Sequence, residues 1–449
     1  MTPDDPGPTR RPADEVARLC GDLLRIDTSN YGDGTGPGER VAAEHVMGLL
    51  HEVGLDPELI ESQRGRASVV VRVEGEPGGT AGRGALLVHG HLDVVPADAR
   101  DWRADPFGGE LQDDGCLWGR GAVDMKGMDA MMLAVLRDLA GSGRRPPRDL
   151  VFAFFADEEA GGVQGSHWLV EHRPDLFEGV REAISEVGGY SVTVAGAGGD
   201  PVRLYLLQTA EKGIAWLRLV AHGRAGHGSQ INTDNAVTRL AQAVARIGEH
   251  AWPIDLTPTV REFLEGVSEI TGVAFDPARP DELLARLGTV AGFVGATLRD
   301  TANPTMLTAG YKHNVVPQVA EAFVDCRFLP GHEEQLLATV RELAGPHIEV
   351  HTHHRDISLE TTFDGALVDA MVAALHAEDP GAPVLPYCLS GGTDNKALSR
   401  LGIRGFGFAP LQLPAGLDFA AMFHGVNERV PVTALQFGTR VLDRLLRTC

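Results

Sequence analysis

The spacing of apolar residues divides the first half of the chain into alternating helices and strands. Apolar positions recur at helical spacing in some segments, whereas others are short runs of β-branched and apolar residues. The expected helices lie at 16–24, 46–53 and 126–139, and the expected strands at 68–73, 85–88 and 150–155. Because these strands are apolar on both faces, we expect an α/β fold. Its sheet should be mixed, largely parallel and covered by helices on both faces.

The pattern changes near residue 210, where the expected strands become apolar on one face only. This region should hold strands at 213–221, 320–328 and 347–351 and helices at 234–247 and 333–343. Such strands predict a small α+β sheet with its helices on one face. The first pattern then returns in the expected helices 367–376 and 433–446 and the expected strand 402–408. We therefore expect a discontinuous domain formed by 1–209 and 356–449, with a second domain, 210–355, inserted in it.

The net charge of the chain limits the classes of molecule that it is expected to bind. There are 40 Lys and Arg residues against 62 Asp and Glu residues, which gives a formal net charge of −22. Nucleic acids and anionic membrane surfaces are bound by basic faces, so this acidity argues against both. The longest apolar runs are also far too short to span a membrane. An excess of carboxylates remains compatible with a metal site.

Cysteine usage and the N-terminal segment indicate a cellular compartment. The five cysteines are widely spaced, odd in number and contain no CxxC pair, so a disulfide framework is not expected. Residues 1–11 are rich in proline and charge and lack the apolar stretch of a secretory signal. We therefore expect a protein of the reducing cytoplasm.

The strongest local signal is Val88-His-Gly-His-Leu-Asp-Val-Val-Pro96, in which an apolar strand runs directly into histidine and aspartate. Open α/β sheets place their sites at such carboxyl ends of strands. Asp93 is spaced to accept the second N–H of a metal-bound His91 and so fix its tautomer. His89 shares a strand face with His91, so spacing alone does not choose between them. For either ring alone, a hydrogen-bonded histidine at a strand end is the alternative.

Two further segments place carboxylates where they could hold cations. In Gly119-Arg-Gly-Ala-Val-Asp-Met-Lys-Gly127, glycines let the backbone turn around Asp124 just before a helix. This carboxylate could bridge two cations, although helix capping is the commoner use of such an aspartate. The strand at 150–155 ends in Asp157-Glu-Glu159. Three adjacent negative charges after an apolar strand are costly unless a cation neutralises them, and a solvated acidic loop is the alternative.

Two weaker signals complete a donor set. Glu186 follows another short strand, and His424 lies in a glycine-containing loop near the C-terminus. Together the candidates are two histidines, one bridging aspartate and two glutamates, with one glutamate to spare as a general base. Such nitrogen and carboxylate donors suit zinc, with cobalt or manganese as substitutes. Three protein ligands for each of two ions leave open positions, as in catalytic centres.

In these motifs the chain resembles the dinuclear zinc peptidases and deacylases. That family includes aminoacylase, acetylornithine deacetylase, succinyl-diaminopimelate desuccinylase and glutamate carboxypeptidase. The matching motifs are, in order, Gly90-His-Leu-Asp-Val-Val-Pro96, Gly121-Ala-Val-Asp-Met-Lys-Gly127, Asp157-Glu-Glu159, Glu186 and His424-Gly-Val-Asn-Glu428. The resemblance implies that His91 and Glu186 hold one zinc, that Glu159 and His424 hold the other, and that Asp124 bridges them.

The resemblance also implies roles around the metals. Asp93 would support His91, and Glu158 would take the proton from a water that the two zinc ions share. The inserted domain would be a lid that carries the interface of a homodimer. Its His227, in Gly223-Arg-Ala-Gly-His-Gly-Ser229, matches a histidine that the family sends into the neighbouring subunit's active site. There it would stabilise the oxyanion.

Substrate contacts follow from the same resemblance. Asn314 and Arg327 match lid positions near the substrate. Gly391, Gly392 and Thr393 lie in Ser390-Gly-Gly-Thr-Asp394, which looks like the loop that receives a free carboxylate. Physically, successive N–H groups in a glycine-rich turn form an anion nest.

The expected activity is hydrolysis of the amide bond of N-acyl amino acids or small peptides with a free carboxylate. A dipeptidase or aminopeptidase of the same family is the alternative, although members with that activity often carry aspartate where this chain has Glu186. The alternative of another class is a catalytically silent homologue that binds metal or ligand. The retention of Glu158 beside all five ligands argues against a silent protein.

Overall fold

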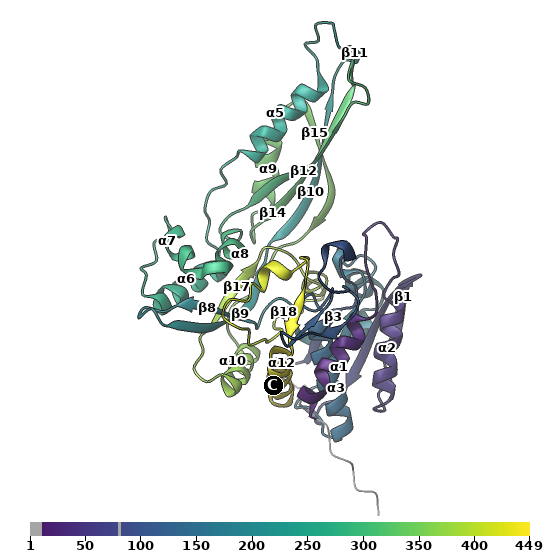
Figure 1. Ribbon diagram of the computed structural model, residues 1–449, viewed down its shortest axis with the longest axis vertical. Helices are drawn as coiled ribbons and strands as arrows, with labels where there is room; N and C mark the ends of the chain where they lie inside the picture. The colour runs from purple at the N-terminus through teal and green to yellow at the C-terminus, as the bar shows by residue number, and fades with distance from the viewer. Residues whose placement is uncertain (1–10, 80–81) are drawn as a thin grey trace, which may run out of the picture. The chain divides into compact units, whose positions relative to one another are not determined.

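The computed structural model describes residues 11–79 and 82–449, which belong to two compact units (Figure 1). Unit 1 comprises Met1–Gln208, Thr361–Pro386 and Thr393–Cys449. Unit 2 comprises Thr209–Glu360 and Tyr387–Gly392. None of the described helices is long and apolar enough to cross a membrane.

A mixed β-sheet forms the centre of unit 1. Its strands, in spatial order, are β1 (Glu58–Gln63), β2 (Arg66–Val73), β6 (Leu150–Phe155), β3 (Ala85–His91), β7 (Val180–Ser185), β18 (Arg404–Gly407) and β9 (Pro201–Glu211). The pairs β6–β3, β3–β7 and β7–β18 are parallel. Towards both edges the pairing is antiparallel, and β8 (Ser191–Ala195) adds to β9 in the same way. The predicted mixed sheet is therefore confirmed, with the four neighbouring parallel strands β6, β3, β7 and β18 at its centre.

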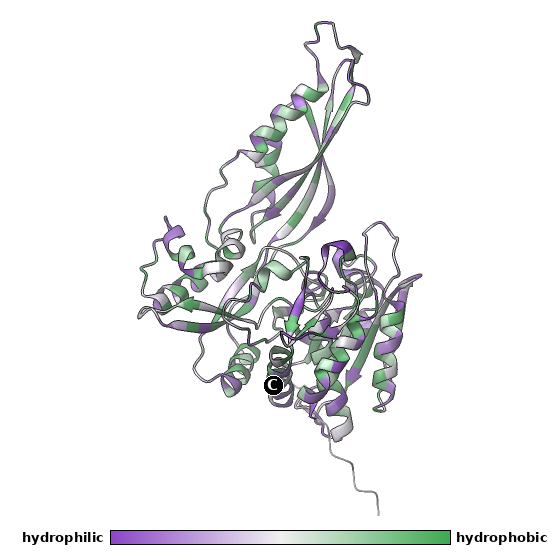
Figure 2. Cartoon of the chain, viewed as in Figure 1, coloured by the Kyte–Doolittle hydropathy of each residue, from purple (hydrophilic) through white to green (hydrophobic). Residues whose placement is uncertain are grey.

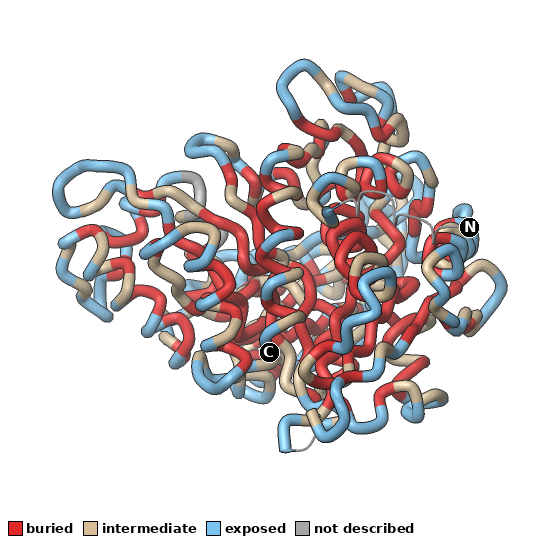
Figure 3. Tube along the Cα trace, turned by 90° about the horizontal axis from the view of Figure 1, so that it is seen from below, coloured by how far each residue is buried: buried red, intermediate tan, exposed pale blue. Residues whose placement is uncertain are grey.

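Helices cover both faces of this sheet, as the apolar strands predicted. On one face lie α1 (Pro12–Leu24), α2 (Arg40–His51), α3 (Lys126–Ser142) and α12 (Val432–Thr448), and α10 (Ala366–Glu378) packs on α12. On the other face, α4 (Ser166–His172) and α11 (Asn395–Ser399) contribute Leu169 and Leu398 to a core with Leu87 of β3. The apolar faces of these helices and the buried strands are visible in Figures 2 and 3.

A small antiparallel sheet brings the C-terminal loop of unit 1 to the turn before α3. It consists of β4 (Glu110–Leu111), β5 (Cys116–Trp118) and β19 (Arg429–Pro431). In this sheet Arg429 pairs with Trp118, and its guanidinium lies 4.8 Å from the indole ring centre. Segments that lie about 300 residues apart along the chain are therefore held side by side next to the predicted site.

Unit 2 contains a four-stranded antiparallel sheet with helices on one face. The strand order is β12 (Thr301–Ala309), β14 (Val319–Phe328), β10 (Gly213–His222) and β15 (Ile348–Asp356). Helices α5 (Ala236–Gly248) and α9 (Glu333–Ala344) cover it, with Leu240 and Val340 in the shared core. Further helices are α6 (Pro258–Thr271), α7 (Asp281–Leu284) and α8 (Ala291–Gly295).

Strand β12 was absent from the sequence-based prediction. It is an edge strand whose side chains are mostly exposed, and Pro304 interrupts its register against β14 between Pro304 and Met306. An exposed edge strand has little apolar alternation, which is the signal that identifies a half-buried strand.

Candidate metal centre

Three of the predicted ligand segments meet at one edge of the unit 1 sheet. His91 ends β3, Glu158 and Glu159 begin the short 3-10 turn Glu158–Ala160 after β6, and Glu186 directly follows β7. Strands β6, β3 and β7 are parallel neighbours, so their carboxyl ends lie together. The side chains are largely withdrawn from solvent: His91 is fully buried and Glu186 is 5% exposed.

Asp124 reaches the same place from the turn before α3. The buried carboxylate of Glu428 accepts backbone N–H groups from Gly121 (3.1 Å), Val123 (2.7 Å) and Asp124 (3.0 Å). Arg120 donates to the same carboxylate at 2.8 Å. The N-cap of α3 is Met125 and no side chain caps it, so Asp124 does not serve as a helix cap. Its carboxylate is therefore available for another partner.

The two oxygens of Asp124 face two different histidines. Oδ1 lies 3.1 Å from Nε2 of His91, and Oδ2 lies 3.2 Å from Nε2 of His424. Each histidine also faces a glutamate, with His91 Nε2 3.5 Å from Glu186 Oε2 and His424 Nε2 2.9 Å from Glu159 Oε2. The side chains thus form two His–Glu pairs on either side of one shared aspartate.

Asp93 connects the strand ends through both its side chain and its backbone. Its carboxylate accepts the N–H groups of Glu158 and Glu159, each at 3.0 Å. Nδ1 of His91 lies 2.9 Å from the peptide oxygen of Asp93 but 3.6 Å from its carboxylate. The contact expected between the Asp93 carboxylate and His91 is therefore made mainly by the Asp93 carbonyl, while the carboxylate fixes the two glutamates.

The Asp93 carbonyl also settles which nitrogen of His91 carries the proton. A carbonyl oxygen can only accept a hydrogen bond, so Nδ1 is the protonated nitrogen. In a neutral ring, Nε2 then presents a lone pair to Asp124 and Glu186. A nitrogen lone pair and carboxylate oxygens repel each other, so a proton or a cation has to lie between them.

The histidines and carboxylates of the cluster shift one another's pKa values. Burial disfavours the charged ring of His91, but Glu186 and Asp124 outweigh burial and raise the pKa of His91 well above its ordinary value. Hydrogen bonds with Asp124 and Glu159 raise the pKa of His424 to about 10. Burial raises the pKa of Glu186 to about 8, and burial together with the Glu186 charge raises that of Glu158. Buried carboxylates that lie this close together favour a positive charge between them.

Two groups of described side chains could hold a metal ion. In each, one donor atom per residue lies within 4.8 Å of the others; the groups are His91, Asp124 and Glu159, and His91, Glu158 and Glu186. Half-exposed His424 adds its Nε2 next to Asp124 and Glu159. Imidazole and carboxylate donors in this number fit zinc and similar divalent ions.

Backbone strain in unit 1 gathers around the same atoms. Among the described residues other than glycine, Asp157, Val187, His424 and Asn427 have positive φ angles, between 53° and 66°. Val187 is β-branched and follows Glu186 directly, and Asp157 directly precedes Glu158. Such conformations persist where surrounding contacts hold a side chain in a required position, and they are common at active sites.

Two further residues, which the motifs did not identify as functional, hold this centre together. One is Glu428, which lies four residues after His424 in the same motif and could have been identified from that position. The other is Asn30, which donates from Nδ2 to Asp93 (2.9 Å) and to Asp157 (3.0 Å). Arg66 donates to the Asn30 oxygen at 2.8 Å and also pairs with buried Glu39. Nothing in the local pattern around Asn30 indicates this role.

His89, which spacing could not distinguish from His91, lies apart from the cluster's ligand groups. Its Nε2 lies 3.1 Å from the Asn395 side-chain oxygen, and its ring packs against Phe155 at 5.4 Å between centres. Burial lowers the pKa of His89 to about 4, so its ring is neutral and serves packing.

Three predicted residues belong to unit 2. His227, in β11 (Gly226–His227), is exposed, and its Nδ1 lies 3.2 Å from the N–H of Ser229. Arg327 makes a two-pronged ion pair with Asp325, at 2.7 Å and 3.1 Å. The peptide oxygen of Asn314 accepts the N–H of Gly228 at 2.9 Å, which ties the loops of His227 and Asn314 together.

The glycine-rich loop lies at the boundary between the two units. Gly391 and Gly392 belong to unit 2 and are partly exposed, whereas Thr393 belongs to unit 1 and is buried. The Thr393 hydroxyl accepts the N–H of Asn395 at 3.2 Å. The loop leads directly into α11, and its two glycines are partly exposed.

Known proteins resemble this chain over most of its length. N-fatty-acyl-amino acid synthase/hydrolase PM20D1 of Xenopus tropicalis is 27% identical over 377 residues, which is 80% of this chain and 71% of that protein. Aminoacylase-1 of Sus scrofa is 26% identical over 404 residues, 88% of this chain and 86% of its own. The M20 family metallo-carboxypeptidase Sso-CP2 from Sulfolobus solfataricus has a TM-score of 0.72 at 20% identity, covering 97% of this chain and 99% of that one.

The family model described as Peptidase family M20/M25/M40 matches residues 87–448. The match begins in β3 and runs through α12, so it includes all the strand ends and loops that supply the cluster. The chain therefore belongs to the peptidase family M20/M25/M40.

Proposed function

We propose that this hydrolase cleaves the amide bond of N-acyl amino acids, or of small peptides with a free carboxylate. Two zinc ions would be held in the cluster, one by His91 and Glu186 and the other by Glu159 and His424. The observation that carries the proposal is the placement of Asp124, whose two oxygens each face a different histidine. A shared carboxylate between two His–Glu pairs is the donor arrangement that a two-metal hydrolase needs.

The residues present fit such ions. His91 and His424 direct Nε2 at carboxylate oxygens, and the raised pKa values of Glu186 and His424 mark a place where a divalent cation would relieve repulsion. When bound, zinc would polarise the amide carbonyl and lower the pKa of an attacking water. Cobalt and manganese accept the same donors and are possible substitutes.

Glu158 is the carboxylate best suited to move the proton. Its Oε2 lies 3.9 Å from His91 Nε2, farther than the contacts made by Asp124 and Glu186. The carboxylate of Asp93 accepts the backbone N–H of Glu158 and fixes its position. Burial and the charge of Glu186 raise the pKa of Glu158, as suits a group that first accepts a proton and then returns it. Glu158 would take a proton from the attacking water and deliver it to the leaving nitrogen.

His227 is suited to stabilise the oxyanion. Because the N–H of Ser229 can only donate, Nδ1 of His227 is the acceptor in that contact, and the neutral ring carries its proton on Nε2. Nε2–H is then a donor available to a developing negative charge. We further propose a homodimer in which each subunit receives His227 from the other, with unit 2 as lid and interface. The free state of all five cysteines fits a cytoplasmic location.

For the substrate carboxylate, we propose contact with the glycine loop in preference to Arg327. Asp325 already occupies the guanidinium of Arg327 in two-pronged geometry, so Arg327 would have to exchange partners to bind substrate. The peptide groups of Gly391 and Gly392, with Thr393 and with Asn314 from the lid, would then contact the carboxylate end of the substrate.

A hydrolysis screen tests the proposed function. N-acetyl, N-succinyl and N-carbamoyl amino acids and a set of dipeptides are offered with added zinc or cobalt, and bound metal is measured on the same samples. Turnover of N-acyl amino acids supports the proposal. Turnover of dipeptides without a free-carboxylate requirement favours the dipeptidase or aminopeptidase reading. Metal binding with no turnover of any substrate would indicate a silent homologue.

A further inference from the structure

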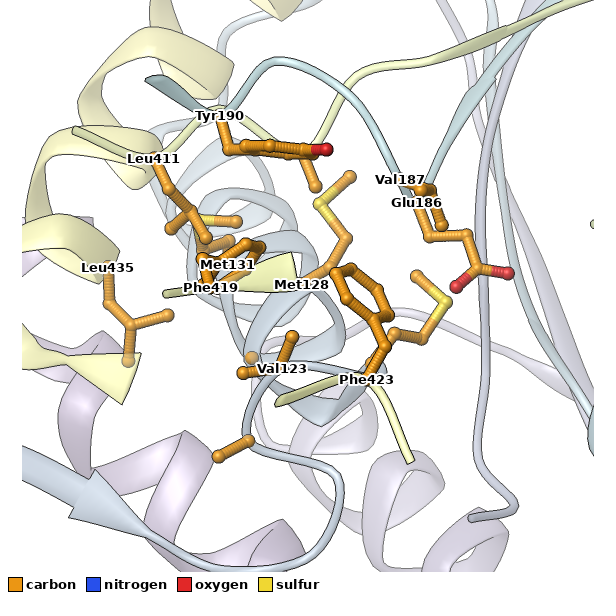
Figure 4. A pocket seen from close by; sticks show the side chains of 14 residues that line it. Val123, Met128, Met131, Glu186, Val187, Tyr190, Leu411, Phe419, Phe423 and Leu435 are labelled. Carbon is orange, nitrogen blue, oxygen red and sulfur yellow. The ribbon is translucent and has the colours of Figure 1, made fainter. Parts of the chain in front are cut away.

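Two cavities of unit 1 differ sharply in size. The apolar one beside Glu186, shown in Figure 4, offers about 20 Å³, which is room for little more than one water molecule. The other offers about 350 Å³ and is partly open to solvent, a size typical of small-molecule sites. The residues of this larger cavity that matter for the argument are Arg83, Arg148, Arg181, Glu182, Ala366 and Leu367. We name it the arginine cavity.

The arginine cavity lies where three parallel strands of the unit 1 sheet begin. Arg83 lies two residues before β3, Arg148 lies two residues before β6, and Arg181 is the second residue of β7. The carboxyl ends of the same strands lead to the candidate metal centre. Strand β7 is six residues long, and six extended residues span about 20 Å. The cavity is therefore at the opposite edge of the sheet from the metal centre.

Positive charge dominates the lining of this cavity, although the chain as a whole carries a formal charge of −22. Three arginines line it with one acidic side chain, Glu182, which Arg148 already neutralises at 2.6 Å. In the described part of the chain, neither Arg83 nor Arg181 forms an ion pair with an Asp or Glu side chain. Even with a terminal carboxylate at Cys449, which also lines the cavity, positive charge stays in excess. Such a cavity attracts anions.

Arg148 is held in the wall of the cavity. The residue is 1% exposed, and its Nη1 donates to Glu182 Oε2 at 2.6 Å. Its buried Nε has no hydrogen-bond partner among the described residues. A buried donor without an acceptor is costly, so this guanidinium favours an acceptor that a ligand would bring. The planar guanidinium group can contact two oxygens of one phosphate or carboxylate at the same time.

Arg181 is positioned by a glycine. A Cβ on Gly84 would lie 2.3 Å from Cγ of Arg181, and the φ angle of Gly84, +73°, also disfavours any other residue there. The side chain of Arg181 thus packs against the backbone just before β3. Because this packing restricts the side chain before a ligand arrives, less entropy is lost on binding.

The first turn of α10 adds peptide donors to the arginines. Ala366 and Leu367, the first two residues of this 13-residue helix, line the cavity. The N-cap is Gly365, and no side chain caps the helix. The first N–H groups of a helix have no partner within it, and their partial positive charge favours phosphate and other anions. The helix end and the arginines therefore favour the same kind of ligand.

We infer that the arginine cavity binds the phosphate group of a small anionic ligand, at a site separate from the metal centre. A phosphate group carries more negative charge than a carboxylate and has more oxygens to accept hydrogen bonds, which suits three guanidinium groups and a helix end in one cavity. The volume of about 350 Å³ also leaves space for a carbon skeleton attached to the phosphate. The inference does not depend on which substrate the enzyme hydrolyses.

Isothermal titration calorimetry of the full chain in its metal-loaded form measures this binding. The ligands are ribose 5-phosphate, inorganic phosphate, glutarate and ribose. Saturable binding of ribose 5-phosphate, with no binding of ribose, supports the inference. A preference for ribose 5-phosphate over inorganic phosphate identifies an organic phosphate as the ligand, whereas equal affinity identifies free phosphate. Binding of glutarate alone, or of none of the anions, would overturn the inference.

Two variants locate the bound phosphate. Arg83→Gln and Arg181→Gln change exposed residues, so the fold should persist in both. Each should raise the Kd of ribose 5-phosphate about tenfold, because one charge-assisted contact is lost. Arg64→Gln makes the same change at an exposed residue between β1 and β2 and should keep the wild-type Kd. If both cavity variants bind ribose 5-phosphate as tightly as the wild type does, the phosphate is held elsewhere, such as at the metal centre, and the inference is wrong.

Discussion

Unit 1 and unit 2 hold their proposed functional side chains in different ways. In unit 1, buried carboxylates fix the backbone of two proposed ligands: Glu428 accepts three N–H groups of the Asp124 turn, and Asp93 accepts the N–H of Glu159. In unit 2, His227 is exposed and contacts Ser229 two residues away, and Arg327 pairs with Asp325 two residues away. Long-range buried bonds fix a geometry before substrate arrives, whereas short-range exposed contacts can be exchanged when it does.

This difference assigns different tasks to the two units. A metal centre that has to position a water, a carbonyl and a proton acceptor needs little reorganisation during the reaction. Side chains that close over a bound substrate need mobility, and they act only in the closed state. In the proposed function, unit 1 would therefore supply the chemistry, and unit 2 would supply groups that act on bound substrate.

Metal removal should have the largest effect, because it empties unit 1 of its proposed cations. We expect about two zinc ions per chain and complete, reversible loss of turnover on chelation, with activity returning on addition of zinc or cobalt. Metal analysis of active enzyme by mass spectrometry checks the count. One tightly held ion in fully active protein, or none, would contradict the two-metal arrangement.

Glu158→Gln should come next. The amide keeps the size of the side chain but cannot accept the proton, so turnover should fall by at least the roughly 10²–10⁴-fold expected for a general base. Metal content should stay at the wild-type value, because Glu158 is assigned to proton transfer. Glu159→Gln is the matched control and should lower metal content. If Glu158→Gln loses metal while Glu159→Gln keeps it, the two roles are exchanged.

His227→Ala tests whether unit 2 contributes to the transition state. Loss of one oxyanion donor should lower kcat by about 10²–10³-fold without changing metal content, because no ligand is touched. Thr233→Ala, at another exposed position of unit 2, is the control and should keep kcat near the wild-type value.

The sharing of His227 between subunits has its own measurement. His227→Ala and Glu158→Gln subunits are mixed and allowed to exchange. In a mixed dimer that shares His227 across the interface, one site carries both defects and the other carries neither, so part of the activity returns. No recovery in dimers proven to have exchanged, or full activity of a strict monomer, would show that each subunit uses its own His227.

Glu428→Gln should have a smaller effect within unit 1. It weakens the charge-assisted bonds to the Asp124 turn and to Arg120, and the loss of a group that orients a ligand lowers metal affinity by about 10–100-fold. Competition with a chromogenic chelator measures the change. At saturating zinc, kcat should return close to the wild-type value, since the ligands themselves remain. A kcat that stays low with zinc bound would show that Glu428 does more than hold the turn.

Much of the fold could be predicted because strong periodicity coincided with burial. Strand β6 was expected at 150–155 and occurs there, since all its residues are apolar and buried. Proposed ligands such as His91 and Asp124 could be identified because they lie at strand ends and in glycine-containing turns. Asn30 could not, because its role comes from contacts with Asp93 and Asp157, 63 and 127 residues away. Edge strand β12 was not predicted because its mostly exposed residues do not alternate between apolar and polar.

The smallest expected effect comes from replacing one asparagine with alanine in each unit. Asn30→Ala removes the donor to Asp93 and Asp157 and leaves Arg66 without its amide acceptor. Buried groups that lose hydrogen bonds should lower the free energy of unfolding by about 1–3 kcal/mol. Asn314→Ala, in the partly exposed lid loop, should change it by less than about 0.5 kcal/mol.

Urea denaturation of both variants, with the metal content held equal, measures the two changes. Because the two units hold their side chains differently, Asn30→Ala should clearly lower the urea concentration at the midpoint of unfolding. The slope of the unfolding free energy against urea concentration should stay the same in both variants. Asn314→Ala should instead act on KM, because its proposed contact forms only with substrate. Equal losses of stability in the two variants would mean that the lid loop is as firmly braced as the metal centre. In that case His227 would sit in a fixed position, and closure of unit 2 would no longer be needed to explain how its side chains take part.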